Sequence, residues 1–144
     1  MNNSKKDRVF KVSEVAEFSI PKSEYVSRML IDSESVGAKS INVNNGILKP
    51  GNSTKGGTHP CPYEEIYYIL RGQGVLTIGN ETWEVGPDTV AYIPCEEYHR
   101  LQNTGNTDLE ILTIMPLPLK EGANSVYDAR KRAWGTSFRK LRKS

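Results

Sequence analysis

The chain has 144 residues and a formal net charge of +2, and this is the length of one ordinary domain. Its composition, 37% hydrophobic and 25% charged, is that of a globular protein rather than a disordered one. No apolar run approaches the roughly 18 residues of a transmembrane helix, and residues 1–10 lack the apolar core of a signal peptide. We therefore predict a cytoplasmic protein with no membrane partner.

The charge is divided unevenly along the chain. Residues 1–129 carry 12 Lys and Arg against 17 Asp and Glu, a net −5, whereas residues 130–144 carry seven basic residues and no acidic one, a net +7. An acidic body argues against nucleic acid as a partner. The basic tail could contact an anionic surface, including the acidic body of a second copy.

The predicted elements follow a simple order. Residues 1–26 mix charged and apolar positions without a clean period, and we read them as an N-terminal leader or arm with at most one short helix. Beyond them, short apolar and alternating runs separated by Gly, Pro and Asn are typical of strands. The predicted strands are residues 29–31, 38–48, 65–70, 75–78, 82–85, 89–93, 99–103 and 109–115. Strands this short and this close together predict an antiparallel sandwich or barrel over residues 27–118.

Residues 119–144 form the predicted tail of the same single domain. Trp134, Phe138 and Leu141 are spaced by four and three residues, as on one apolar face of a helix. Gly135 weakens that helix. The apolar face would need cover, either from the barrel or from a partner subunit.

The chain has two histidines, and each lies among residues that suit a metal site. Cys61 and Glu65 follow His59 at even spacings, so an extended segment would point all three to one face and Glu64 to the other. Imidazole, thiolate and carboxylate groups all bind divalent transition metals. His99 would have to arrive from a neighbouring strand.

The run from His59 to Gly72 resembles the first motif of the cupin family. It has His59, then Cys61 where that family has a second His, then Glu65 and, after six residues, Gly72.

The run from Gly86 to Asn103 resembles the second cupin motif. It has Pro94, then Glu96 in place of a Gly, then His99 and Asn103. The resemblance extends over about half of the chain, from residue 48 to residue 116.

The resemblance implies an all-β fold, an antiparallel double-stranded β-helix or jelly-roll cupin barrel with a short C-terminal helical tail. It places metal ligands at His59, Glu65 and His99, with Cys61 at the fourth ligand position. Three alternatives remain open: Cys61 ligates as a thiolate, Cys61 is a bystander beside two imidazoles and a carboxylate, or the site has lost its metal. The cofactor would be one divalent transition metal ion (Fe, Zn, Mn, Ni or Cu).

For function, we expect an enzyme of the dioxygenase or isomerase/lyase type that acts on a small polar molecule in the barrel. Tyr63 and Tyr67 share the inward parity of the ligands and could assist proton transfer. Arg28, Lys39 and Arg100 are candidates to hold an anionic substrate. The alternative is a non-catalytic protein that binds a sugar or a carboxylate, because fold does not settle function.

Cys61 and Cys95 are expected to be free thiols in a cytoplasmic protein. A bond between them would require the two motifs to face each other across the barrel. Small cupins of this type are usually dimers, so the resemblance implies a homodimer, with the leader or the tail across the interface.

Overall fold

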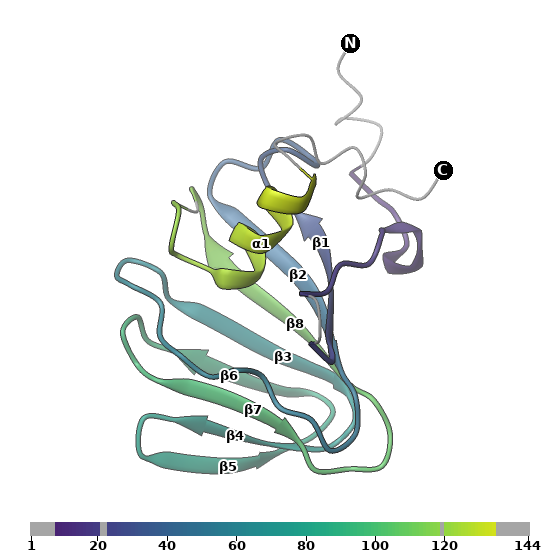
Figure 1. Ribbon diagram of the computed structural model, residues 1–144, viewed down its shortest axis with the longest axis vertical. Coiled ribbons are helices and arrows are strands. Elements are labelled where there is room, and N and C mark those ends of the chain that lie inside the picture. Colours follow the sequence, from purple (N-terminus) through teal and green to yellow (C-terminus); the bar gives the residue numbers. More distant parts are fainter. Residues whose placement is uncertain (1–7, 21–22, 119, 135–144) are drawn as a thin grey trace.

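The computed structural model describes residues 8–20, 23–118 and 120–134. Within these ranges the chain forms eight strands and one α-helix (Figure 1). In chain order the elements are the 3-10 helix η1 (Val12–Glu14), the strands β1 (Tyr25–Ile31), β2 (Ile41–Leu48), β3 (Glu65–Arg71), β4 (Gly74–Ile78), β5 (Glu81–Val85), β6 (Thr89–Ile93), β7 (His99–Asn103) and β8 (Leu109–Pro116), and the helix α1 (Ser125–Trp134).

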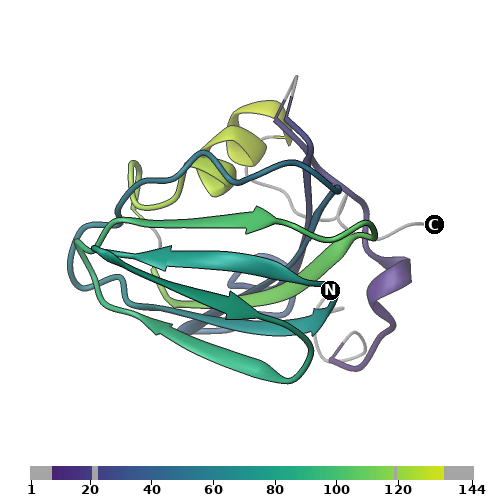
Figure 2. The ribbon, with the colours of Figure 1, turned by 90° about the horizontal axis from the view of Figure 1, so that it is seen from below.

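The strands form the two sheets of a jelly roll. The larger sheet has the order β1-β2-β8-β3-β6 and the smaller one β5-β4-β7, with antiparallel pairing throughout. Seen from below, the strands wrap around an interior rather than lie in one flat layer (Figure 2). The all-β fold with a short C-terminal helix confirms the predicted fold class. Each predicted strand overlaps an observed one.

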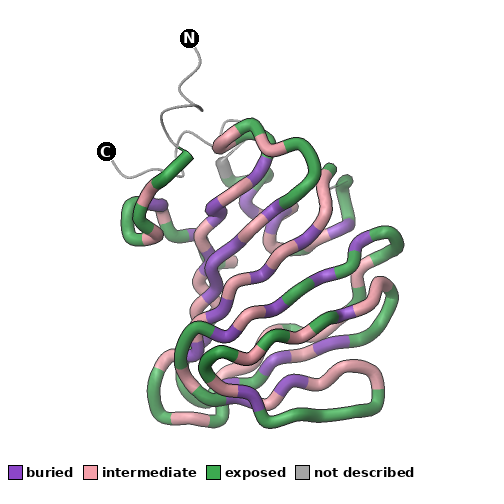
Figure 3. The backbone as a smooth tube through the Cα atoms, turned by 180° about the vertical axis from the view of Figure 1, so that it is seen from behind, coloured by how far each residue is buried: buried purple, intermediate pink, exposed green. Residues whose placement is uncertain are grey.

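The period of two along the strands separates the core from the surface. Every second residue of β8 is buried, and buried and more exposed residues alternate in the same way along the first five residues of β3 (Figure 3). The inward-facing apolar side chains form a core between the two sheets, made of Leu48, Tyr67, Ile69, Leu76, Val85, Ile93, Leu101, Leu109 and Ile111.

A segment that the sequence pattern did not predict as extended runs beside β7. Thr54 N donates to Leu101 O at 2.8 Å, and His99 N donates to Gly57 O at 2.9 Å. Isolated bridges join Ser53 to Gln102 and Gly57 to His99. The segment therefore covers an edge of the smaller sheet and delivers the next part of the chain, including His59, to the start of β7.

The helix α1 lies across one end of the larger sheet, near β1, β2 and β8 (Figure 1). A second apolar cluster packs beside it, made of Val15, Met29, Leu30, Tyr63, Met115, Ala123 and Tyr127. The predicted apolar face of the tail lies outside the described residues, because Phe138, Leu141 and the side chain of Trp134 are not among them. Within the described ranges, no helix is long and apolar enough to cross a bilayer. The division of the chain into leader, barrel and tail stays a prediction.

Gly72 follows β3, at a place where only glycine fits. Its φ is +92°, in the left-handed region, and a Cβ there would overlap the carbonyl oxygen of Asp108. Gly51 also has a positive φ, +78°, but a Cβ there would meet nothing within 4 Å. Substitutions at the two glycines therefore distinguish the cost of a left-handed backbone from the cost of a steric overlap.

We expect Gly72→Ala to lower the free energy of unfolding by about 3 kcal/mol, because it combines left-handed strain with a steric overlap. Gly51→Ala should lower it by only about 1 kcal/mol, from the strain alone. Urea unfolding followed by circular dichroism measures both. Equal losses in the two variants would show that the close approach to Asp108 does not matter.

Candidate metal site and cavity

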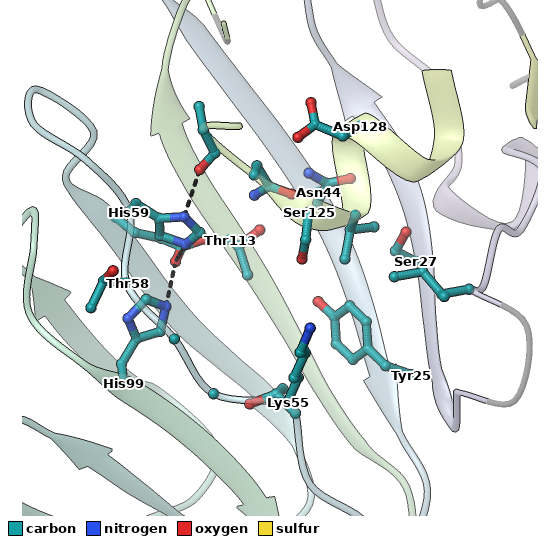
Figure 4. A pocket seen from close by; sticks show the side chains of 18 of the residues that line it. Tyr25, Ser27, Asn44, Lys55, Thr58, His59, His99, Thr113, Ser125 and Asp128 are labelled. Carbon is teal, nitrogen blue, oxygen red and sulfur yellow. Dashed lines mark hydrogen bonds and ion pairs between the residues drawn. The ribbon is translucent and has the colours of Figure 1, made fainter. Parts of the chain in front are cut away.

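Three side chains from different parts of the chain converge inside the barrel (Figure 4). The Nε2 atoms of His59 and His99 lie 3.2 and 3.3 Å from Oε1 of Glu65. The two imidazole centroids are 5.0 Å apart, and one potential ligand atom from each residue lies within 4.8 Å of the other two. The fold thus brings together the three residues that the motifs singled out; that they hold a metal stays a prediction.

Backbone carbonyls orient both imidazoles. Nδ1 of His59 is 2.7 Å from Ala123 O, in the turn before α1, and Nδ1 of His99 is 3.2 Å from Glu97 O. A carbonyl oxygen only accepts, so each Nδ1 carries the proton and donates it. In the neutral ring, Nε2 then presents a lone pair toward Glu65, which is how metal-binding histidines are commonly held.

The Glu65 carboxylate is buried, and its Oε1 accepts no hydrogen bond of normal geometry. Burial alone would raise the pKa of Glu65, but His59 and His99 outweigh it and hold that pKa below its ordinary value. Burial alone would lower the pKa of His59, but the Glu65 carboxylate and the Ala123 carbonyl together raise it. A buried carboxylate oxygen without a hydrogen bond, facing two nitrogen atoms, fits a metal cation.

Cys61 is not part of this cluster. It forms a disulfide with Cys95, with the two Cα atoms 4.9 Å apart, so the expectation of free thiols is wrong. A disulfide sulfur offers no thiolate to a metal, and the expectation that Cys61 ligates is corrected accordingly. The parity argument failed here because Cys61 begins a turn and not an extended strand.

The disulfide joins the two stretches that carry the histidines. Close to it, Glu96 N donates to His59 O at 2.6 Å. Disulfides are typical of oxidising compartments, so the cytoplasmic location stays a prediction that the redox state of Cys61 and Cys95 in cells would test.

The two predicted catalytic tyrosines differ in position. The hydroxyl of Tyr63 donates to Pro118 O at 2.6 Å and accepts from Lys120 N at 3.1 Å. Tyr63 packs in the apolar cluster beside α1, and its role in proton transfer stays a prediction. Tyr67 lies inward on β3, its ring edge-on to His99 at 6.1 Å, and its catalytic role stays a prediction.

A cavity of about 460 Å³ opens beside the three converging side chains. Both sheets, the segment before β3 and the start of α1 contribute to its walls. Its hydroxyl and amide side chains are Ser23, Tyr25, Ser27, Asn44, Ser53, Thr54, Thr58, Tyr67, Thr113, Asn124 and Ser125. Its charged side chains, apart from the histidines, are Lys55, Glu65 and Asp128. Such walls suit a small polar molecule better than an apolar one.

The predicted anion-binding residues do not line this cavity. Among the described lining residues there is neither Arg28, nor Lys39, nor Arg100. Arg28 pairs with Glu17 at 2.6 Å, and Arg100 donates to Ser53 Oγ at 2.8 Å. Arg28 and Arg100 alternate with the buried residues of β1 and β7, and Lys39 precedes β2.

Arg130 is a residue whose role the sequence did not reveal. It is fully buried on α1 and donates to Ser27 Oγ at 2.8 Å and to Asn44 Oδ1 at 3.2 Å. Burial lowers the pKa of Arg130 to about 10, although Asp32 opposes the shift. Arg130 therefore ties α1 to two residues of the cavity wall. Arg130 stands in a run of basic residues, and nothing in the sequence distinguishes it from its neighbours as a buried residue.

The comparisons with known proteins agree with this geometry. The profile described as "Cupin domain" matches residues 46–115. The oxalate-binding protein of Thermotoga maritima is 41% identical over 71 residues, covering 49% of this chain and 57% of that protein. The glucose-6-phosphate isomerase of Thermococcus kodakarensis is 36% identical over 88 residues, covering 53% of this chain and 47% of that protein. The chain thus spans about half the length of these curated relatives.

A solved structure from Thermotoga maritima, described as "a predicted oxalate decarboxylase", superposes with a TM-score of 0.68. It is 30% identical to this chain and is covered over 99% of its length, while 76% of this chain is matched. The chain belongs to the cupin superfamily. Its relatives include enzymes as well as proteins named only for binding.

We expect Cys61→Ser and Cys95→Ser to have the same effect. The bond joins residues 34 apart, and losing it should lower the free energy of unfolding by about 3–4 kcal/mol. Both variants should also lose metal affinity equally, because both free the two histidine-bearing stretches from each other. Urea unfolding and metal titration measure the two effects, and reduced wild-type protein is the control. A much larger loss of metal in Cys61→Ser would restore Cys61 as a ligand.

Proposed function

We propose that this cupin binds one divalent transition metal ion through His59, Glu65 and His99 and is an enzyme of the isomerase or lyase type. One observation supports the metal above all: the buried Oε1 of Glu65 lies 3.2 and 3.3 Å from two Nε2 atoms and accepts no hydrogen bond of normal geometry. A proton or a metal ion must neutralise the buried negative charge of Glu65 at this position. Because both Nδ1 atoms are engaged with carbonyls, the lone pairs that remain are the ones a metal takes.

In this proposal the cavity side chains hold the metal ion and orient the substrate beside it. A bound ion would act as a Lewis acid toward a carbonyl or hydroxyl oxygen of the substrate. Glu65 and the two histidines hold their ligand atoms at one wall of the cavity, while hydroxyl and amide side chains on the other walls orient a polar molecule. We propose that Tyr67, whose ring lies edge-on to His99, holds or passes a proton at its hydroxyl.

The relatives support this proposal in part. One is an isomerase of a sugar phosphate and another is an oxalate-binding protein. A cavity walled by hydroxyls and amides agrees with molecules of that polarity. The second candidate is a protein that binds such a molecule without converting it. The same cavity lining favours it, and only a turnover assay distinguishes it from an enzyme.

Metal content tests the ligands. Wild-type protein reconstituted with a divalent metal should retain about one ion per chain in mass spectrometry of the eluted metal, and Glu65→Gln and His99→Ala should lower the affinity more than about 100-fold. Glu64→Gln is the matched control, because the adjacent Glu64 contacts the hydroxyl of Tyr92 outside the cavity. Equal metal content in Glu64→Gln and Glu65→Gln would refute the site.

Turnover tests the reaction type. Metal-loaded protein is incubated with aldoses, sugar phosphates and hydroxy acids, and proton NMR is recorded while an electrode follows dissolved oxygen. New signals without oxygen uptake are the result expected of an isomerase or lyase. Oxygen uptake would instead identify a dioxygenase, and saturable binding without new signals would identify a binding protein.

We further infer that two copies associate through the outer face of β3 and β6. Ile66, Leu70, Val90 and Tyr92 are 37%, 38%, 67% and 58% exposed on this face. The strand β6 is also an edge of the larger sheet. Exposed apolar side chains beside an unpaired sheet edge favour association with a second copy. Parts of the leader (residues 1–7 and 21–22) and of the tail (residues 119 and 135–144) lie outside the described residues, and the role of either segment as an arm stays a prediction.

Val90→Glu should therefore shift the protein toward the monomer, because it introduces a charge at the centre of this apolar face. Sedimentation velocity at micromolar concentration measures the shift. Val9→Glu is the control, since Val9 is 92% exposed and lies away from the sheets. A wild-type protein that is already monomeric, or a dimer that Val90→Glu leaves intact, would contradict the interface.

A further inference from the structure

Two tyrosines in the cavity carry hydroxyls without a hydrogen-bond partner among the described residues. Tyr25 is the first residue of β1 and Tyr67 lies in β3, and both line the cavity with Glu65 and His99. Tyr67 is only 6% exposed. Tyr25 is partly buried. Two phenol hydroxyls that face one cavity and have no such partner are available to donate to a bound ligand.

The sequence makes room for Tyr25 in this position. In the register of the sheet Tyr25 pairs with Leu48, but its ring lies over Gly46, two residues along β2 toward the cavity. A Cβ on Gly46 would overlap the Tyr25 hydroxyl and ring. A glycine inside a strand often marks such a close approach. The Tyr25 hydroxyl is thus held on the cavity wall by packing and not by a hydrogen bond.

Lys55 brings a positive charge to the same cavity. It lies in the segment beside β7, and Figure 4 shows its side chain reaching into the space that Tyr25 also faces. Within the part of the chain that the structure describes, Lys55 has no ion-pair partner. The acidic side chain of the cavity outside the metal ligands, Asp128, instead accepts from Gly122 N at 2.9 Å.

These three side chains offer two hydroxyl donors and an ammonium. We propose that Tyr25, Tyr67 and Lys55 form a subsite for the anionic group, carboxylate or phosphate, of a small hydroxylated substrate. Such donors bind an anionic acceptor more strongly than a neutral one. The subsite lies on the same cavity as His59, Glu65 and His99, so the rest of the substrate would reach those ligands. This assignment deepens the proposed function and rests on it for the identity of the reaction.

The test measures binding of three probes to metal-loaded and metal-stripped protein by titration calorimetry: glycolate, glycerol 3-phosphate and neutral glycerol. Lys55→Met should weaken the binding of at least one anionic probe about tenfold, and Tyr25→Phe should weaken the same probe about fivefold. Neither variant should change metal content. Lys39→Met and Tyr92→Phe are the matched controls, because both residues lie outside the cavity, and their binding should equal that of wild type.

The two anionic probes show whether the anionic group of the substrate is a carboxylate or a phosphate. Tighter binding of glycolate assigns the subsite to a carboxylate, and tighter binding of glycerol 3-phosphate assigns it to a phosphate. The proposal is overturned if wild-type protein binds glycerol as well as the anions, binds neither anion at millimolar concentration, or binds them unchanged after Lys55→Met.

The two proposals fail separately. If wild-type protein binds metal but Lys55→Met does not weaken anion binding, the metal site is supported and the anion subsite is refuted. Anion binding that depends on Lys55 in a protein that takes up no metal would keep the subsite and remove the metal-dependent function. Thermal unfolding of each variant, which the exposed Lys55 and the single lost oxygen of Tyr25 should hardly change, shows that a loss of binding is not a loss of fold.

Discussion

The buried carboxylate of Glu65 faces the Nε2 atoms of two histidines, and this arrangement needs a positive charge between the three groups. Unless it is protonated, each Nε2 presents a lone pair, because each Nδ1 carries the proton and donates it to a backbone carbonyl. Three acceptor atoms cannot remain together out of water without a cation. A proton on His59 would meet this need in part, because the Glu65 carboxylate and the Ala123 carbonyl raise the pKa of His59. A bound transition metal ion, as we propose, would meet it in full.

The surrounding structure serves to hold that arrangement in place. The segment beside β7 sets His59 against His99 through backbone hydrogen bonds. The disulfide between Cys61 and Cys95 fastens the same two stretches together. On the far side, α1 is anchored by the buried Arg130, and the turn before it supplies the Ala123 carbonyl that orients His59. Ala123 and Arg130, both in the described part of the tail, thus support the site.

The strands were predictable because their period of two and their Gly and Pro boundaries are local features. The convergence of His59, Glu65 and His99 was predictable because these residues fall on two spaced motifs. The positions of Cys61 and Tyr63 were not, because a turn at Cys61 breaks the extended geometry on which the parity argument depends. The register that places Tyr25 over Gly46, and the packing that buries Arg130, come from contacts between residues far apart in sequence. For Gly46 there was one signal, a glycine inside a predicted strand.

An anomalous-difference map of metal-soaked crystals, recorded on both sides of the absorption edge of the metal, tests the central claim most directly. The account predicts one strong peak per chain, located between His59 Nε2, His99 Nε2 and Glu65 Oε1, with no contribution from Cys61. A map with no peak at this position after soaking, or with the metal bound at Cys61 or elsewhere, would contradict it.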